Sequence, residues 1–193
     1  MRLLTFLVIL FISSATLAQI DQNSQQQLVK MAEQVQEIRE SLKKYNQENI
    51  PLALQELVLE IDNIHIQTLQ NIIDLHGWPT KDKVGEKGVQ AAFLLVKHSE
   101  SLVFQQDMLP LIIQSFLDKE GIAGKDVAQF TDNVSIRLGK KQVFGTQSEL
   151  INGKIIFAPI ENEDSVDPLR AQMGMSTLAE YKETLKTLYD LQR

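Results

Sequence analysis

Apolar side chains recur at steps of three and four residues through most of this 193-residue chain. Such positions share one face of an α-helix, so the pattern predicts amphipathic helices packed around a common core. The stripe is clearest over residues 28–45 and 54–73, on either side of Pro51. Proline fits the first turn of a helix because it lacks a backbone N–H. The two segments therefore predict a pair of long helices, the second ending at about residue 75.

The helical pattern continues in later segments that are bounded by glycine or polar residues. Helices are predicted over residues 89–96, 102–117 and 126–138. Pro110 lies inside the second of these and is expected to kink it or to start a new segment. Near the end of the chain, Thr177 and Glu180 have the spacing of a capping box. An amphipathic helix is therefore predicted at the C-terminus.

Between residues 139 and 167 the sequence changes to a β-type pattern. Residues 142–150 and 154–160 are rich in β-forming side chains and flank Asn152-Gly153. This dipeptide is the strongest short signal for a two-residue hairpin turn. Residues 168–174 are expected to form a turn or a short helical piece. The predicted fold class is α+β and predominantly helical, with about five to six helices and one β-hairpin near residues 142–160.

Several polar residues belong to the first predicted strand of this hairpin. Side chains alternate between the two faces of a strand, so Gln142 and Thr146 are expected on one face and Gln147 on the other. Gln142 and Thr146 then either line a cleft or form an exposed edge. Gly145 in a strand indicates a bulge or a close approach of the backbone by a helix or a ligand.

The first 18 residues resemble a cleavable secretory signal peptide. Met1-Arg2 supplies a positive start, residues 3–12 are apolar except for Thr5, and the small residues that follow end at Ala18. We expect cleavage after Ala18 and export to the periplasm or outside the cell. The apolar run is about half of the roughly 20 residues that span a bilayer, so no stable membrane insertion is expected after cleavage.

The predicted organisation is a signal peptide over residues 1–18, a glutamine-rich leader and N-terminal helix over 19–50, and a single mostly helical domain over 51–193. Residues 19–27 are expected to be solvated and loosely ordered. The chain has no cysteine, so it forms no disulfide and must be stabilised by its core. Its net charge of −6 argues against a nucleic acid as partner.

No metal or cofactor site is predicted from the ionisable residues. His65, His76 and His98 are too far apart in sequence to form a helix-borne zinc pair, and the acidic residues 161–167 lack the pattern of an EF-hand loop. His65 lies beside an apolar stripe, where a packed imidazole is expected. His98 ends an alanine-rich segment, so its imidazole either caps a helix or takes part in proton transfer or substrate binding. No nucleophile elbow or phosphate-binding loop is present.

Several short motifs occur together in this chain. They are Gly77-Trp78-Pro79, Val84-Gly85, residues 91–98, Phe104-Gln105, residues 142–147, Pro159-Ile160-Glu161 and residues 166–170. In this order they resemble a bacterial family, the domain-of-unknown-function 6624 family, over roughly residues 55–190. That range leaves the glutamine-rich first helix mostly outside the shared region, where it is expected to act as a spacer.

The family resemblance implies a set of polar signature residues. They are His98, Gln105, Asp132, Gln142, Gly145, Thr146, Gln147, Asp167 and Arg170. The chain departs from the family pattern at Asn133 and Leu169, where arginine is usual, which counts against an arginine-rich anion site. Arg170 remains, either to clamp a carboxylate or to form a salt bridge with Asp167.

Three hypotheses about function follow from these residues. The first is a cell-envelope binding or interaction module with an unidentified ligand or protein partner, for which Gln105, Gln142, Thr146, Gln147, Asp167 and Arg170 are the candidate binding residues. The alternative is an enzyme of unknown reaction, with His98 as general acid or base, Asp132 orienting it, and Gln142, Gln147 and Arg170 lining the site. It requires His98 to share a cleft with Gln147 or Asp132. In the third, the buried polar residues satisfy the backbone of loops.

Overall fold

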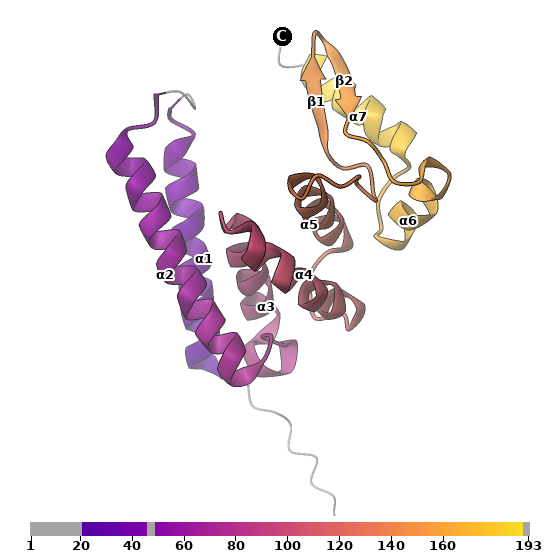
Figure 1. The fold of residues 1–193 in the computed structure, drawn as a ribbon. Coiled ribbons are helices and arrows are strands. Elements are labelled where there is room, and N and C mark those ends of the chain that lie inside the picture. The colour runs from indigo at the N-terminus through magenta and orange to yellow at the C-terminus, as the bar shows by residue number, and fades with distance from the viewer. Residues whose placement is uncertain (1–20, 46–48, 191–193) are drawn as a thin grey trace, which may run out of the picture.

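The computed structural model describes residues 21–45 and 49–190, so the predicted signal peptide lies outside the described residues. The elements are α1 (Gln22–Leu42), α2 (Leu52–His76), α3 (Lys81–His98), α4 (Leu102–Leu117), α5 (Gly124–Arg137), β1 (Ser148–Ile151), β2 (Lys154–Phe157), α6 (Val166–Gln172) and α7 (Leu178–Asp190), with a short 3-10 turn at Glu163–Ser165 before α6. Figure 1 shows α1 and α2 side by side, and the hairpin with α6 and α7 at the other end of the molecule. The predicted α+β, predominantly helical class is confirmed. The described residues form seven α-helices, more than predicted, because residues 166–172 also form a helix.

The first helix starts earlier than the glutamine-rich sequence indicates. Asp21 precedes it, and its carboxylate accepts hydrogen bonds from the backbone N–H groups of Asn23 and Ser24 at 3.1 and 3.2 Å. This cap satisfies amides that would otherwise need water. The expectation of a loosely ordered leader is therefore wrong from Gln22 onward. The helix buries Leu28, Met31, Ala32 and Val35 and packs against α3.

The third helix is longer than its apolar segment predicts. It begins at Lys81 and not near residue 89, because a polar first turn and two glycines hide its start in the sequence. The chain kinks at Gly85, which has φ 67° and ψ 166°. Such a positive φ strains any residue with a Cβ, so glycine suits the kink. Helix α4, in contrast, continues through Pro110 from Leu102 to Leu117.

The core lies among the first five helices. Its buried apolar residues include Leu28, Leu69, Val89, Val96, Ile112, Val127 and Val134. Phe93 of α3 and Phe130 of α5 meet edge to face with their ring centroids 5.9 Å apart. His65 of α2 is also buried, as its apolar stripe predicts, and its Nε2 lies 3.1 Å from Oε1 of Gln34. No described helix is both long and apolar enough to cross a membrane.

The hairpin is shorter than predicted. β1 and β2 pair in antiparallel register from Ser148↔Phe157 to Ile151↔Lys154 around the turn at Asn152-Gly153, where both residues have positive φ, 50° and 74°. This is the turn that the dipeptide predicts. Residues 142–147 form a loop that touches the second strand segment through one parallel bridge, Gln142↔Ile160. The assignment of Gln142, Thr146 and Gln147 to two faces of a strand is therefore wrong.

Helix α7 covers one side of the hairpin. Its predicted capping box is confirmed, because the backbone N–H of Thr177 donates to the Glu180 carboxylate at 2.9 Å and the N–H of Glu180 donates to Oγ1 of Thr177 at 3.3 Å. Tyr181, one residue further, packs against Phe157 of β2 with ring centroids 6.1 Å apart. The hairpin thus rests on α7 and is linked to the helical core through the loop at residues 139–147.

Candidate functional site

The loop at residues 142–147 is held by Asp132, which projects from the last part of α5. Its Oδ1 accepts hydrogen bonds from the backbone N–H groups of Val143 and Phe144 at 2.7 and 3.0 Å. Its Oδ2 accepts from both the N–H and Oγ1 of Thr146 at 2.9 Å each. The side chain is 0 % exposed. A buried carboxylate needs such a set of donors, so Asp132 and the loop stabilise each other.

Gln142 closes the same loop from inside. Its Nε2 donates to the carbonyl oxygens of Gln147 and Ala158 at 3.0 and 2.7 Å, and its Oε1 accepts from the N–H of Gln147 at 2.8 Å. The side-chain amide therefore forms the hydrogen bonds with Gln147 and Ala158 that the backbone of a neighbouring strand would otherwise form, at the point where the regular pairing of β1 and β2 ends. Because all of these partners are backbone groups, Gln142 is fully engaged in the fold.

Arg170 of α6 holds the loop from the other side. Its Nη1 donates to the carbonyl of Phe144 at 2.8 Å and its Nε to the carbonyl of Ser176 at 2.6 Å. The guanidinium lies 4.9 Å from the centroid of the Tyr181 ring. Arg170 is absent from the ion pairs of the described residues, so the expected salt bridge with Asp167 is not formed. Asp167 instead accepts from the N–H of Leu178 at 2.7 Å.

Gly145 marks a close approach to the start of α7. Its φ is 65°, and a Cβ at this position would lie 2.8 Å from Cδ1 of Leu178 and 3.2 Å from Cδ1 of Ile160. The positive φ favours glycine, and a larger residue would also push the tips of the Leu178 and Ile160 side chains aside. The close approach that a glycine in this segment predicts is thus made by a neighbouring helix.

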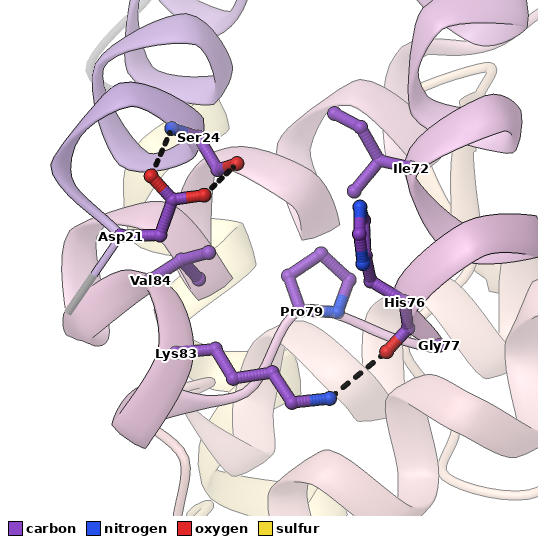
Figure 2. Close-up of a pocket in the computed structure, with 8 residues that line it drawn as sticks. All are labelled: Asp21, Ser24, Ile72, His76, Gly77, Pro79, Lys83 and Val84. Carbon is purple, nitrogen blue, oxygen red and sulfur yellow. Dashed lines mark hydrogen bonds between the residues drawn. The ribbon is translucent and has the colours of Figure 1, made fainter. Parts of the chain in front are cut away.

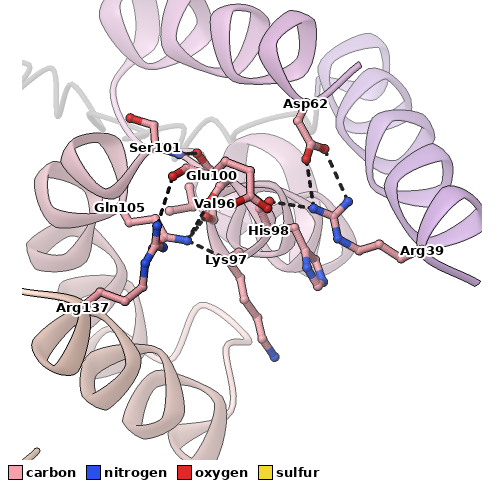
Figure 3. A network of polar contacts seen from close by, with 10 residues as sticks. Arg39, Asp62, Val96, Lys97, His98, Glu100, Ser101, Gln105 and Arg137 are labelled. Carbon is pink, nitrogen blue, oxygen red and sulfur yellow. Dashed lines mark hydrogen bonds and ion pairs between the residues drawn. The ribbon is translucent and has the colours of Figure 1, made fainter. Parts of the chain in front are cut away.

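The C-terminus of α3 is the second polar centre, and Figure 3 shows its contacts. Gln105 of α4 is 2 % exposed, and its Nε2 lies 3.2, 3.1 and 2.9 Å from the carbonyl oxygens of Val96, Lys97 and Ser99. Its Oε1 accepts from Nη1 of Arg137 at 2.6 Å. The last carbonyls of a helix have no partner within the helix. Gln105 supplies a shared partner and fixes the chain on both sides of His98.

Two arginines complete this polar centre. Arg39 of α1 donates to the carbonyl of His98 at 2.7 Å and to the Asp62 carboxylate of α2 at 2.9 Å. Arg137 of α5 donates to the carbonyl of Glu100 at 3.1 Å. Sequence analysis missed Arg39 and Asp62. A signal was present, because Asp62 shares a helical stripe with the buried His65 and Leu69, and a carboxylate on a buried stripe requires a partner.

His98 lines a cleft of about 230 Å³, which we call the His98 cleft, and it also borders a separate depression beside Arg39 and Glu40 of α1. Its lining residues are Lys97, His98, Gln129, Phe130, Asn133, Thr146 and Gln147. The cleft thus brings together three of the predicted site residues, His98, Thr146 and Gln147. Of the other predicted residues, Asp132 lies directly behind Thr146, whereas Gln105, Gln142, Asp167 and Arg170 are not part of the lining.

The electrostatic surroundings keep the His98 imidazole neutral. Burial, together with the positive charges of Arg39 and Lys97, lowers the pKa of His98 to about 4. Asp62 opposes this shift only weakly. Asp132 forms no hydrogen bond with His98, since its oxygens are taken by the loop. At neutral pH the ring therefore presents one N–H donor and one unprotonated nitrogen to its surroundings.

The lowered pKa of His98 predicts a pH-dependent stability. The unfolded chain protonates this residue below about 6.5, the folded chain only below about 4. The unfolded state therefore binds more protons between these values, and stability falls as the pH drops from 6.5 to 4. Because the ring is partly solvated, we expect a loss of about 1 kcal/mol.

Urea unfolding of the protein and of His98→Gln at several pH values measures this effect. The lowered pKa of the buried His65 adds a loss in the same direction, which both proteins share. The variant should show a shallower fall in unfolding free energy over this pH window. Equal slopes for the two proteins would mean that folding does not depress the pKa of His98.

A further cavity lies where α1 begins and α2 ends (Figure 2). It measures about 250 Å³ and is lined by apolar residues together with Asp21, Ser24, His76 and Lys83. Three of the polar side chains are used within the fold, those of Asp21, Ser24 and Lys83. Asp21 accepts from Oγ of Ser24 at 2.6 Å, and Nζ of Lys83 donates to the carbonyl of His76 at 2.9 Å. In the part of the chain that the structure describes, no cluster of histidine, aspartate and glutamate is suited to a metal ion.

Comparison with known proteins identifies the family. The model of the family of unknown function DUF6624 matches residues 22–193. No curated protein and no solved structure matches the chain. The match begins at the first residue of α1, and this helix buries four residues in the core, so the idea of a spacer outside the shared region is wrong. The chain belongs to the DUF6624 family of unknown function.

Proposed function

We propose that the protein is an exported binding protein of the cell envelope and that the His98 cleft holds its ligand. The observation that carries this proposal is the contrast between two groups of polar residues. Asp132, Gln142 and Arg170 are engaged with the backbone around the loop. Lys97 and His98, in contrast, line an open cleft together with amide side chains. Convergent polar groups in a cleft are the usual mark of a ligand site.

The composition of the cleft indicates the kind of ligand. The lining residues comprise one lysine, one neutral histidine, three amide side chains, one threonine and one phenylalanine, and none of them is acidic. Although the chain has a net charge of −6, the cleft offers hydrogen-bond donors and one positive charge, which suit a ligand that carries hydrogen-bond acceptors. The volume of about 230 Å³ suits a molecule the size of one sugar or one amino acid. A carboxylate near Lys97 is the favoured contact.

The enzyme hypothesis finds less support in the same cleft. His98 and Gln147 share it, as that hypothesis requires. An imidazole with a pKa of about 4, however, carries no proton to give as a general acid at neutral pH and is a weak general base. Asp132 is engaged elsewhere and does not orient the ring. Binding is therefore the function that we favour, and export rests on the sequence of residues 1–18.

Calorimetry with defined probes tests the proposed site. Purified protein without the predicted signal peptide is titrated with D-glucuronate, L-glutamate and N-acetylglucosamine. We expect the carboxylates to bind and Lys97→Met to weaken that binding by about tenfold, because the cleft loses its charged donor. Lys87→Met, at an exposed position of the same helix, is the matched control and should leave binding unchanged. Equal affinity in both variants, or no binding by any probe, would refute the proposal.

A further inference from the structure

Another depression lies between the hairpin and α7, and we call it the hairpin groove. It encloses about 470 Å³, and its lining includes Lys154, Lys182, Lys186, Tyr189, Leu150 and Ile156. Lys182, Lys186 and Tyr189 follow one another at steps of four and three residues, so they form one stripe of α7. The strands supply the apolar part of the groove through Leu150, which is 41 % exposed, and the buried Ile155, which is its cross-strand partner on the same face of the hairpin. The groove therefore combines an exposed apolar surface with several ammonium groups.

The charge of the groove is opposite to that of the chain. Three lysines and no acidic residue line it, although the chain has a net charge of −6. Lys186 pairs with Glu183 at 2.6 Å on the surface, while Lys154 and Lys182 form no ion pair with the side chains that the structure describes. The positive charge of the groove would attract an acidic partner, although the chain as a whole is negative. An anionic membrane surface fits less well, because the rest of the chain would be repelled.

The edge of β1 offers a second mode of attachment. The two residues that flank a two-residue hairpin turn form two backbone hydrogen bonds with each other, and so does every second pair further along the strands. The residues of the pairs between point their backbone groups away from the partner strand. In this hairpin the pair next to the turn is Ile151↔Lys154, so Glu149↔Ile156 is the next hydrogen-bonded pair. The bond from the N–H of Ala158 to the carbonyl of Gln147 fits the same alternation. The backbone groups of Ser148 and Leu150 therefore point away from β2. These groups take part in no other backbone hydrogen bond of the described residues.

Leu150 connects the two features, since its side chain lines the groove while its backbone lies at the free edge. We propose that an extended acidic segment of a partner protein binds here, pairing with β1 as a third strand. Every second side chain of such a segment faces the groove. Carboxylates at these positions reach Lys182 and Lys186 of α7, and apolar residues at the intervening positions lie beside Ile151, which is 48 % exposed on the opposite face. Strand addition supplies affinity, and the lysines supply specificity.

Fluorescence anisotropy with a labelled Glu-Ile-Glu-Ile-Glu peptide tests this inference on the purified protein. We expect saturable binding that weakens with salt, and a loss of about tenfold or more in the double variant Lys182→Glu, Lys186→Glu. The double variant Lys125→Glu, Lys140→Glu carries the same change of charge at exposed sites on the helical side and should bind like the wild type. Circular dichroism confirms that both variants are folded.

Two further probes make the test specific. Methylation of alternate peptide nitrogens removes the donors that strand pairing needs, so the methylated peptide should bind at least about tenfold more weakly. Equal affinity for the methylated and the unmethylated peptide would contradict strand addition. Equal affinity of the two double lysine variants for the peptide would contradict binding at the hairpin groove. Vesicles of phosphatidylglycerol are the remaining arm. Binding to these vesicles that is lost in the groove variant, without binding of the peptide, would assign the surface to lipid and overturn the proposal.

Discussion

Replacing Asp132 with asparagine is expected to lower the free energy of unfolding by about 3–5 kcal/mol. Both carboxylate oxygens accept hydrogen bonds, Oδ1 from Val143 and Phe144, and Oδ2 from the N–H and Oγ1 of Thr146 and, at 3.3 Å, from Phe144. In asparagine one of the two oxygens becomes an NH₂ group. Whichever way the amide turns, a donor then faces donors in a fully buried place, and the loop must open.

Urea unfolding followed by circular dichroism measures this loss. Asp118→Asn is the matched control, because Asp118 is an exposed carboxylate at the end of α4 whose partner is one glutamine side chain. That change should cost less than about 0.5 kcal/mol. A loss below about 1 kcal/mol in Asp132→Asn would contradict the role of the carboxylate as the anchor of the loop.

The second large effect is expected for Arg170→Ala, with a loss of about 3–4 kcal/mol in the free energy of unfolding. Arg170 is 1 % exposed and is among the largest fully buried side chains of the described residues. Its removal leaves the carbonyls of Phe144 and Ser176 without their donor and leaves a cavity beside Tyr181. The part of the chain most affected should be the contact between the loop, α6 and α7.

Arg170→Lys separates geometry from charge at this position. Lysine keeps the positive charge, but its ammonium group lacks the planar fork that joins the two carbonyls. We expect a loss intermediate between those of wild type and Arg170→Ala, measured by the same urea unfolding. If the arginine instead serves to clamp a ligand carboxylate, both variants would keep the wild-type stability and lose binding of D-glucuronate in the calorimetric assay.

The helices could be predicted because their information is local. A period near 3.6 and the Thr177–Glu180 capping box are contained in short windows of sequence, and the structure confirms both. The 142–147 loop could not be predicted in the same way. Its residues favour a strand, but Asp132, Gln142 and Arg170 bind its backbone in another shape. Two of these three side chains come from other elements, so tertiary contacts override the local preference.

The candidate site divides along similar lines. The position of His98 at a helix end follows from the alanine-rich segment before it, as the sequence predicts. Its lowered pKa could not be predicted, since Arg39 lies 59 residues away in the sequence and reaches the end of α3 only after α1 has packed against that helix. Lys97 and Asn133 were not predicted as cleft residues for the same reason. They lie on α3 and α5, and no local sequence pattern indicates that they line one cleft.

The way in which the 142–147 loop is held has a consequence for engineering. A loop stabilised by its own turn residues can be moved to another scaffold with its sequence. This one cannot, because its shape is encoded partly in α5 and α6, through Asp132 and Arg170. A designer who wishes to transplant it must carry the supporting helices as well, and a library that varies the loop must leave both anchors untouched.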